Sequence, residues 1–266
     1  MFQHKEFTQV AISALKANDG FKPVILIPVY NHQDAISSTL ERVLTYNTPI
    51  VLVDDGSNDE CKTVLIALSK KYADNVHLTH LAINSGKGAA VKKGFNVAYE
   101  LGYSHALQID ADGQHDATSI PLFLKKAEQY QQAIISGYPE YDQSVPALRF
   151  YARYLTHIWV WINTLSLTIK DSMCGFRVYP LALITELINT EQCGDRMNFD
   201  TEILVRWLWR DLAIINLATK VHYPENGVSH FMVWRDNALI SWMHTRLFFG
   251  MLKRLPVLIA RKIHVK

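Results

Sequence analysis

Short apolar runs alternate with longer segments of helical periodicity over the first 137 residues of the chain. The apolar runs occupy residues 24–27, 50–53, 76–81, 106–109 and 133–136. The periodic segments between them occupy residues 34–46, 59–72, 88–101 and 119–131. Continuous Val, Ile and Leu strands that alternate with helices are typical of a mostly parallel sheet covered on both faces. The pattern therefore predicts an α/β fold.

The pattern changes after residue 137. Aromatic side chains crowd into residues 150–161, on a helix that we expect to start after Pro146. A Gly-Phe-Arg turn at residues 175–177 then precedes a further helix and strand. Because no Ser-, Gly- or Pro-rich linker divides the chain, we interpret residues 1–235 as one domain, followed by a basic segment at 236–266.

Composition excludes several classes of protein. A hydrophobic fraction of 49% and a charged fraction of 20% exclude a disordered or fibrous chain, and a net charge of +2 gives no indication of a nucleic-acid partner. The three cysteines have no CxxC spacing, so we expect neither a disulfide framework nor a zinc site, and a reducing, cytoplasmic compartment. We also expect no signal peptide and no transmembrane helix.

Polar or glycine-rich clusters follow four of the predicted strands. They read PVYN at residues 28–31, DDGS at 54–57, NSGKG at 84–88 and DADGQH at 110–115. Parallel α/β sheets bind their ligands in the crevice at the carboxyl ends of the strands. We therefore expect these four clusters to line one site.

Two carboxylates stand close together in the last of these clusters. Asp110 and Asp112 are two residues apart, which places their side chains on the same side of an extended chain. Such a pair repels unless a cation lies between the two groups, and a hard divalent ion with phosphate oxygens suits it. Gln114 could add a neutral oxygen ligand. The alternative, a simple Asp-Gly turn, accounts for Asp112 but not for Asp110.

The second and third clusters suggest a nucleotide. An acidic side chain at Asp54 or Asp55 could accept hydrogen bonds from a ribose or a base, although Ser57 or Asp59 could instead cap the next helix. The glycines of Gly86-Lys87-Gly88 would let backbone N–H groups approach a phosphate at a helix N-terminus, with Lys87 adding a positive charge. The spacing is not that of a Walker A loop.

Taken together, these motifs resemble the family 2 glycosyltransferases of the GT-A fold. The similarity extends over about residues 22–235 and is greatest to the branch that includes the dolichyl- and polyprenyl-phosphate sugar transferases. The segment DSMCGFR at 171–177 resembles the D-x-x-x-G-F-R element of that branch, and FDTE at 199–202 resembles its late acidic element.

The resemblance implies a UDP- or GDP-sugar donor, a Mg²⁺ or Mn²⁺ ion on its diphosphate, and transfer with inversion at the anomeric carbon. It implies a donor-binding half at residues 22–137 and an acceptor half at 138–235. The implied donor-binding residues are Pro28, Tyr30, Asn31, Asp54, Asp55, Gly86, Lys87 and Asp110. Asp110, Asp112 and Gln114 would serve the metal and the donor sugar.

The acceptor remains open between two chemical classes. A lipid phosphate needs cations to position it, and Arg149, Arg153 and Arg177 are candidates, although each could instead lie on a solvated helix face or pair with a local acid. An acceptor hydroxyl needs a general base, for which Asp200 and Glu202 are candidates unless they only complement a helix dipole.

Two histidines are further candidates. His230 could approach the diphosphate or the metal, and His115 follows the acidic pair directly. A lone histidine is more often a hydrogen-bonded structural residue, so both assignments have that alternative.

The C-terminal segment combines apolar and basic residues. From Arg235 onward it has seven Lys or Arg and one acid, with a broad apolar surface from Leu239 to Met251 and a break expected near Pro256. Helices of this type lie at membrane interfaces. A helix packed on the core, a homo-oligomer contact and a protein-docking surface are the alternatives.

We therefore expect a metal-dependent glycosyltransferase at the cytoplasmic face of a membrane, acting on a lipid-linked or membrane-bound acceptor, with no nucleic-acid partner. The competing hypotheses are transfer to a hydroxyl of a soluble glycan or small molecule, and a non-catalytic nucleotide-binding module.

Overall fold

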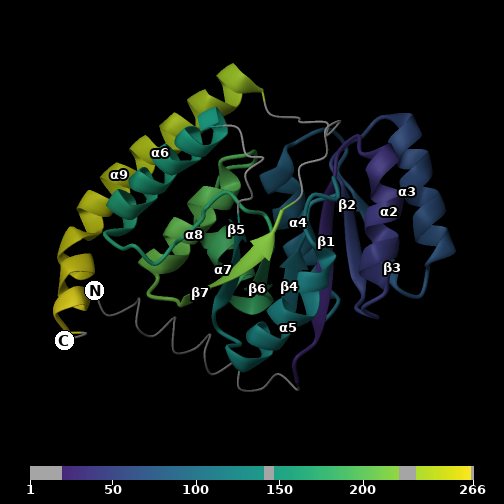
Figure 1. Ribbon diagram of the computed structural model, residues 1–266, viewed down its shortest axis with the longest axis horizontal. Helices are drawn as coiled ribbons and strands as arrows, with labels where there is room; N and C mark the ends of the chain where they lie inside the picture. Colours follow the sequence, from purple (N-terminus) through teal and green to yellow (C-terminus); the bar gives the residue numbers. More distant parts are fainter. Residues whose placement is uncertain (1–19, 141–146, 222–231, 265–266) are drawn as a thin grey trace.

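The computed structural model describes residues 20–140, 147–221 and 232–264, and these form a seven-stranded sheet between two layers of helices (Figure 1). The strands follow one another across the sheet in the order β3-β2-β1-β4-β6-β5-β7. Their bounds are β1 Pro23–Val29, β2 Ile50–Asp54, β3 Val76–His80, β4 His105–Gln108, β5 Ile134–Glu140, β6 Arg177–Pro180 and β7 Ile214–Lys220. The five strands predicted from the first half of the sequence are all present.

One strand runs against the others. β1 pairs in parallel with β2 and β4, β2 with β3, and β5 with β7, whereas β6 is antiparallel to both β4 and β5. Because β1, β2 and β4 are parallel neighbours, the loops that follow them emerge at the same edge of the sheet. β3 is parallel to β2, so the cluster that follows β3 lies at this edge as well, and the edge holds all four polar clusters.

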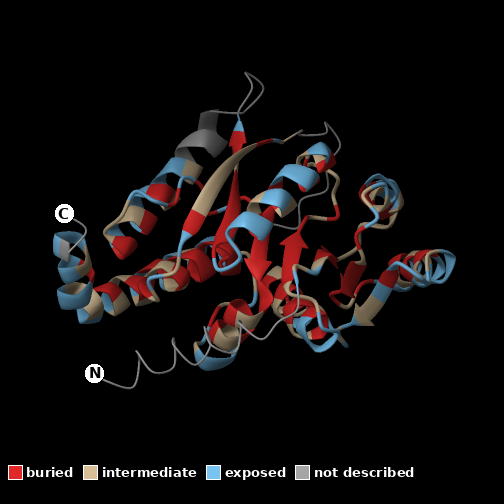
Figure 2. Cartoon of the chain, turned by 90° about the horizontal axis from the view of Figure 1, so that it is seen from below, coloured by how far each residue is buried: buried red, intermediate tan, exposed pale blue. Residues whose placement is uncertain are grey.

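The helices cover both faces of the sheet, and the inner strands are buried, whereas the edge strands β3 and β7 are partly exposed (Figure 2). Their bounds are α2 Gln33–Leu44, α3 Asp59–Lys71, α4 Lys87–Glu100, α5 Ile120–Gln129, α6 Ala147–Thr164, α7 Leu181–Thr190, α8 Phe199–Trp209 and α9 Val233–His264, with a short 3-10 helix at Ala117–Ser119. One apolar core joins the sheet to α4, α7, α8 and parts of α6 and α9. The other joins the opposite face to α2, α3 and α5.

The start of α3 shows how side chains define the loops at the site. The helix is capped by Asn58, whose side chain accepts a hydrogen bond from the backbone N–H of Cys61 at 2.9 Å. The sequence predicted a cap at Ser57 or Asp59, which is wrong. Ser57 is instead held by the first cluster, since its Oγ accepts a hydrogen bond from the N–H of Asn31 at 3.1 Å.

Helix α9 continues through Pro256 without the predicted break. A proline inside a helix removes one backbone hydrogen bond, but packing on the core can outweigh that loss. The buried side chains of Met251 and Leu258 on either side of Pro256 supply this packing. Part of α9 lies against α6, so two helices far apart in the sequence lie side by side (Figure 1).

The apolar surface predicted for the C-terminal segment is divided between the core and the solvent. Met243, Leu247 and Met251 are buried in the core, whereas Trp242 and Phe249 are exposed. Within the described ranges, no helix has both the length and the apolar character that crossing a bilayer requires.

The three cysteines are unpaired and buried. Burial raises the pKa of the Cys174 thiol to about 11 and that of Cys193 to about 12, because the charged thiolate is disfavoured away from water. These two side chains therefore act as small apolar residues of the core.

Acid is expected to destabilise the fold partly through His105. Burial lowers the pKa of this histidine to about 4, although its Nε2–H donates to the carbonyl of Gln131 at 3.0 Å. The unfolded chain binds the proton near the ordinary pKa of 6.5. The unfolded state therefore takes up more protons as pH falls from 6.5 to 4, and stability declines by on the order of 3 kcal/mol over that window.

Urea denaturation at a series of pH values measures this loss. In the His105→Asn variant, the decline in the free energy of unfolding between pH 6.5 and 4 should be smaller, whereas in His77→Gln, at an exposed position of β3, it should be unchanged. An identical pH dependence of the His105 variant and the native chain would contradict the assignment.

Candidate functional site

Three charged side chains from distant segments meet at the carboxyl edge of the sheet. The Nζ of Lys87, in the first turn of α4, lies 2.8 Å from Oδ1 of Asp110 after β4. The same Nζ lies 3.0 Å from Oδ2 of Asp200, in the first turn of α8. We call Lys87, Asp110 and Asp200 the charged centre. It confirms that the third and fourth clusters of the sequence converge.

Two members of the charged centre, Lys87 and Asp110, are held in their ionised forms. Burial alone would raise the pKa of Asp110, but the ammonium of Lys87 and a contact from His115 outweigh burial and hold this pKa well below its usual range. Burial likewise disfavours the ammonium, yet Asp110 and Asp200 keep the pKa of Lys87 above its ordinary value. His115 is buried with its Nε2 at 3.4 Å from Oδ2 of Asp110, so it orients that carboxylate.

The Gly-Phe-Arg turn covers the charged centre closely. A Cβ atom added at Gly175 would lie 2.8 Å from Nζ of Lys87 and 2.9 Å from Oδ2 of Asp110. Real Cβ atoms essentially never approach other atoms this closely, so a side chain at this position would displace one of the two charged groups. The backbone of residue 175 therefore forms one wall of the centre.

Replacing Gly175 with alanine is expected to lower the turnover number by about tenfold to a hundredfold, because small displacements of catalytic groups are costly. The matched control is Gly102→Ala, where a Cβ meets nothing within 4 Å and φ is +82°. That variant should lose about 1 kcal/mol of stability through backbone strain but keep its turnover. Equal turnover of the two variants would contradict the role of Gly175.

Asp112 supplies a second carboxylate beside Asp110. Burial, and next the negative charge of Asp110, raise the pKa of Asp112 above its ordinary value. Its Oδ1 accepts a hydrogen bond from the backbone N–H of Gln114 at 3.0 Å. The two carboxylates are therefore close enough to repel each other, as the sequence predicted.

The residues present fit a hard divalent cation bound together with a ligand. The donors are carboxylate oxygens, and the ammonium of Lys87 already shows that this position attracts a cation. Among the described residues, no group of three His, Cys, Asp or Glu side chains is arranged to hold a metal alone. Mg²⁺ is commonly bound by one or two carboxylates plus substrate phosphates, which matches this donor set.

Asp54 stabilises the loop after β2 and does not face an open ligand site. This corrects the expectation that it binds a nucleotide. Its side chain is fully buried. Oδ1 accepts a hydrogen bond from the N–H of Ser57 at 2.9 Å, and Oδ2 lies 3.0 Å from Nδ1 of His80. Both oxygens thus have partners within the protein.

Asp55 joins the second cluster to the third. Its oxygens accept hydrogen bonds from the N–H groups of Ser85 and Gly86 at 2.8 and 2.9 Å, and from the amide of Asn84 at 3.3 Å. Burial raises its pKa, and the two backbone N–H groups oppose that change. In this structure Asp55 holds the loop that presents Lys87, so it positions the charged centre.

The first cluster ends β1 with a rigid turn. Pro28 is buried and Tyr30 is half-buried. Asn31 has a left-handed backbone with φ of 50°, and its Oδ1 accepts a hydrogen bond from the N–H of Asn58 at 2.8 Å. Asn31 therefore fastens this turn to the start of α3.

Arg177 does not face a ligand, which corrects the expectation that it positions an acceptor phosphate. It is fully buried, and its guanidinium donates to the carbonyls of Asp200 and Ser172 at 2.6 and 2.8 Å. The alternatives from sequence were a solvated helix face and pairing with a local acid. Arg177 instead fixes the first turn of α8, where Asp200 lies.

Glu202 does not act as a general base in this arrangement, because its carboxylate is enclosed by positive charge. Its side chain has no exposed surface and lies 2.7 Å from Nη2 of Arg206 and 3.2 Å from Nη2 of Arg246. It also accepts the N–H of Gly194 at 3.0 Å. Its role is to join three segments of the chain.

Arg153 pairs with a partner that the sequence did not identify. Its Nε and Nη2 donate to the two oxygens of Asp171 at 2.6 and 2.8 Å, which joins α6 to the DSMCGFR segment. Asp171 also accepts the N–H groups of Met173 and Cys174. The order Asp-Ser-Met-Cys is consistent with such a turn, since Asp often bonds to backbone two or three residues on.

Two candidates cannot be placed. His230 and the side chain of Arg149 lie outside the residues and side chains that the structure describes.

The geometry can be compared with known proteins. The sequence matches the model of glycosyl transferase family 2 over residues 24–183. A dolichyl-phosphate beta-glucosyltransferase of Dictyostelium discoideum is 30% identical over 222 residues, which cover 75% of this chain and 63% of that protein. An undecaprenyl-phosphate 4-deoxy-4-formamido-L-arabinose transferase of Serratia proteamaculans is 28% identical over 184 residues, which cover 67% of this chain and 54% of that protein. The chain thus spans less than two thirds of the length of either relative.

A solved structure shares the fold. Glucosyl-3-phosphoglycerate synthase from Mycobacterium tuberculosis, in complex with Mn²⁺, uridine-diphosphate-glucose and phosphoglyceric acid, matches with a TM-score of 0.61 at 14% identity. The match covers 90% of this chain and 81% of that one, which confirms the predicted GT-A architecture. Because the family model matches more than half of the chain, the protein belongs to glycosyltransferase family 2 and is a glycosyltransferase.

Proposed function

We propose that this glycosyltransferase transfers a sugar from a UDP- or GDP-sugar to a polyprenyl-type lipid phosphate, with inversion at the anomeric carbon. The observation that carries the proposal is the charged centre beside Asp112, at the edge of the sheet where nucleotide ligands bind. The names of the relatives, which act on dolichyl and undecaprenyl phosphates, support the acceptor class.

The residues of the edge divide into two roles in this proposal. Asp110 and Asp112, with Gln114, would hold a Mg²⁺ or Mn²⁺ ion, which would neutralise charge on the departing nucleoside diphosphate. Lys87 adds a positive charge at the N-terminus of α4, where a phosphate is favoured. Tyr30 and the neighbouring turn would contact the base and ribose.

The ion pairs of the two candidate general bases, Asp200 and Glu202, favour a phosphate acceptor. A hydroxyl must lose its proton to a base during transfer, whereas a lipid phosphate is already ionised. Asp200 is paired with Lys87, and Glu202 is enclosed by two arginines. The phosphate oxygen would form the new bond to the anomeric carbon as the bond from that carbon to the diphosphate breaks.

A transfer assay tests the proposal. The purified protein is incubated with Mn²⁺, a UDP- or GDP-sugar and either undecaprenyl phosphate or undecaprenol, and the lipid products are identified by mass spectrometry. We expect a glycosylated lipid phosphate and no product from the alcohol. Product from the alcohol alone, or from neither lipid with any donor, would overturn the proposed acceptor class.

Membrane contact through α6 and α9 belongs to the same proposal. The two helices lie side by side (Figure 1). Both expose large apolar side chains. These include Tyr154, Leu155, Ile158, Trp159 and Ile162 on α6, and Trp234, Trp242, Phe249, Leu252, Val257, Ile259 and Ile263 on α9. An apolar helical surface with basic residues favours a membrane interface. The three unpaired cysteines fit a reducing compartment, which supports a position at the cytoplasmic face.

Replacing Phe249, which is 58% exposed, with serine is expected to weaken binding to vesicles by about tenfold, because burying an aromatic side chain contributes roughly 1.5–3 kcal/mol. Co-sedimentation with vesicles of anionic phospholipid measures the effect. Leu122→Ser is the matched control, since Leu122 is 51% exposed on α5, on the other layer of helices. Equal binding of both variants and the native chain would argue against this surface.

A further inference from the structure

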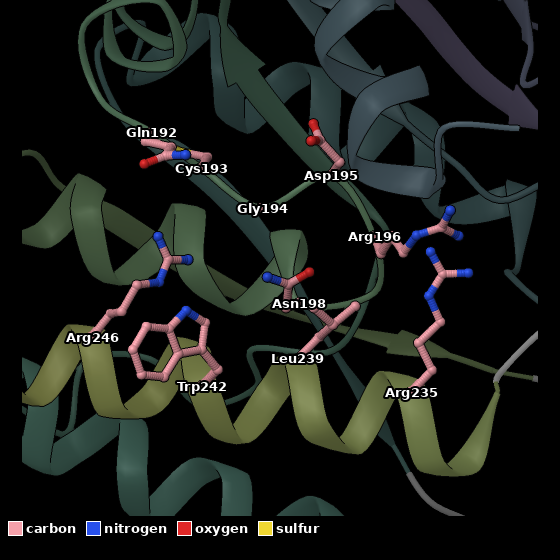
Figure 3. A pocket seen from close by; sticks show the side chains of 10 residues that line it. All are labelled: Gln192, Cys193, Gly194, Asp195, Arg196, Asn198, Arg235, Leu239, Trp242 and Arg246. Atoms are coloured by element: carbon pink, nitrogen blue, oxygen red, sulfur yellow. The ribbon is translucent and has the colours of Figure 1, made fainter. Parts of the chain in front are cut away.

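A pocket of about 340 Å³ lies between residues 192–198 and the first half of α9 (Figure 3). Its lining carries more positive than negative charge, with Arg196, Arg235 and Arg246 against the single acid Asp195. The proposed transfer reaction uses none of these four side chains. The pocket nevertheless lies next to the loop that precedes Lys87, because a Cβ atom at Gly86 would lie 2.6 Å from Cγ of Arg196.

Internal contacts hold both walls of the pocket. Glu202 accepts a hydrogen bond from the N–H of Gly194 on one wall and pairs with Arg246 on the other. Lys92 of α4 donates to the carbonyl of Cys193 at 3.0 Å and pairs with Asp195 at 2.6 Å. The loop at residues 192–198 and helix α9 are therefore fixed relative to each other, so internal contacts of the fold maintain the pocket.

The charges of the lining do not cancel. Arg246 is neutralised by Glu202, and Asp195 by Lys92. For Arg196 and Arg235, no carboxylate within the described ranges lies at ion-pair distance. The charge of Arg196 acts on Asp55 only from farther away, where it opposes the rise in the pKa of Asp55 that burial causes. The hydrogen bond of Arg196 goes to the neutral Oδ1 of Asn84 at 3.4 Å.

Figure 3 shows the guanidinium groups of Arg196 and Arg235 turned toward each other, one from each wall. Two like charges that approach each other destabilise the empty pocket, and an anion between them relieves the repulsion. Guanidinium groups bind phosphate through paired hydrogen bonds, which are stronger than those between neutral groups. The pair is therefore complementary to a phosphate group.

Beside the polar side chains of Gln192 and Asn198, the pocket has apolar surface on α9. Leu239 and Trp242 lie four and seven residues after Arg235, on the same face of α9. Trp242 is 61% exposed and stands over the pocket (Figure 3). A ligand held at the arginine pair would thus have apolar surface next to it.

We propose that this pocket binds the phosphate group of an amphiphilic molecule, with Arg196 and Arg235 on the phosphate and Leu239 and Trp242 on its apolar chain. The site is separate from the charged centre and does not depend on the proposed transfer reaction. A free phosphate shares the headgroup chemistry, so the test compares the two sources.

Isothermal titration of the full-length protein with octyl phosphate, below its critical micelle concentration, tests the proposal. The expected result is saturable binding that weakens by about tenfold in Arg235→Gln, since a charge-assisted pair is lost. Lys253→Gln is the matched control, because it removes the same charge from an exposed position of α9 outside the pocket. That variant should bind within about twofold of the native chain, as screened surface charge contributes little.

Two further titrations separate the sources of the phosphate. Inorganic phosphate should bind the native chain at least about tenfold more weakly than octyl phosphate, because it buries no apolar surface. Trp242→Ala should weaken octyl phosphate but not inorganic phosphate. Equal affinity for the two probes would overturn the lipid assignment. An equal loss in Arg235→Gln and Lys253→Gln, or no saturable binding, would overturn the site itself. Assays of sugar transfer are not involved, so these outcomes are independent of the proposed function.

Discussion

Replacing Asp112 with asparagine is expected to lower the turnover number for sugar transfer by about a thousandfold, the scale on which removing one electrostatic contact of a reacting group acts. Asparagine has the same shape, and its Oδ1 can still accept the N–H of Gln114. Only the negative charge is lost. Because the charge of Asp110 and burial already disfavour the ionised form of Asp112, the thermal midpoint should stay unchanged or rise.

A loss of turnover without a loss of thermal stability would separate an effect on catalysis from an effect on folding. The turnover number and the thermal midpoint are measured on the same preparation, together with Asp116→Asn as a control. Asp116 caps the 3-10 helix a few residues later, and asparagine is an equally good cap. The control should behave like the native chain. If Asp112→Asn retained more than about a tenth of native turnover, the proposed electrostatic role of Asp112 would be wrong.

Replacing Glu202 with glutamine is expected to lower the free energy of unfolding by about 3–5 kcal/mol, because breaking a buried ion pair leaves an uncompensated charge. The carboxylate has no exposed surface and faces Arg206 and Arg246. The amide keeps the shape of the side chain but not its charge. The two arginines then remain together with one negative charge fewer.

Urea denaturation measures this change, with Glu186→Gln as the control. Glu186 also pairs with an arginine, Arg210, at 3.1 Å, but its side chain is 37% exposed. Removing such a partly exposed pair should cost only about 0–1 kcal/mol. Equal losses in the two variants would show that burial of Glu202 is not the cause.

The sequence predicted the first half of the fold well because the signals there are local. A buried parallel strand reads as a continuous apolar run, and each run of the first half corresponds to a strand. The clusters at the strand ends followed from the topology of such sheets. The prediction that Lys87 and Asp110 would share one site was correct for the same reason.

The roles of Arg177 and Glu202 could not be predicted, because they depend on partners far away in the sequence. Arg177 bonds to the carbonyl of Asp200, and Glu202 pairs with Arg246 on the last helix. From the local sequence alone, a charged residue is expected to be exposed, because its distant partner is not known. The continuity of α9 at Pro256 could not be predicted either, because it depends on packing. Buried side chains in the turns on both sides of Pro256 keep the helix intact.

The buried cysteines have a practical consequence. Alkylating reagents react with the thiolate form of an accessible cysteine, and all three native side chains are buried. The native chain should therefore stay unlabelled by maleimide under native conditions. A single cysteine introduced in place of Lys253 on α9 would then be the sole attachment point for a fluorophore or spin label. Such a probe would report directly on whether this helix contacts a bilayer, as the proposed membrane surface requires.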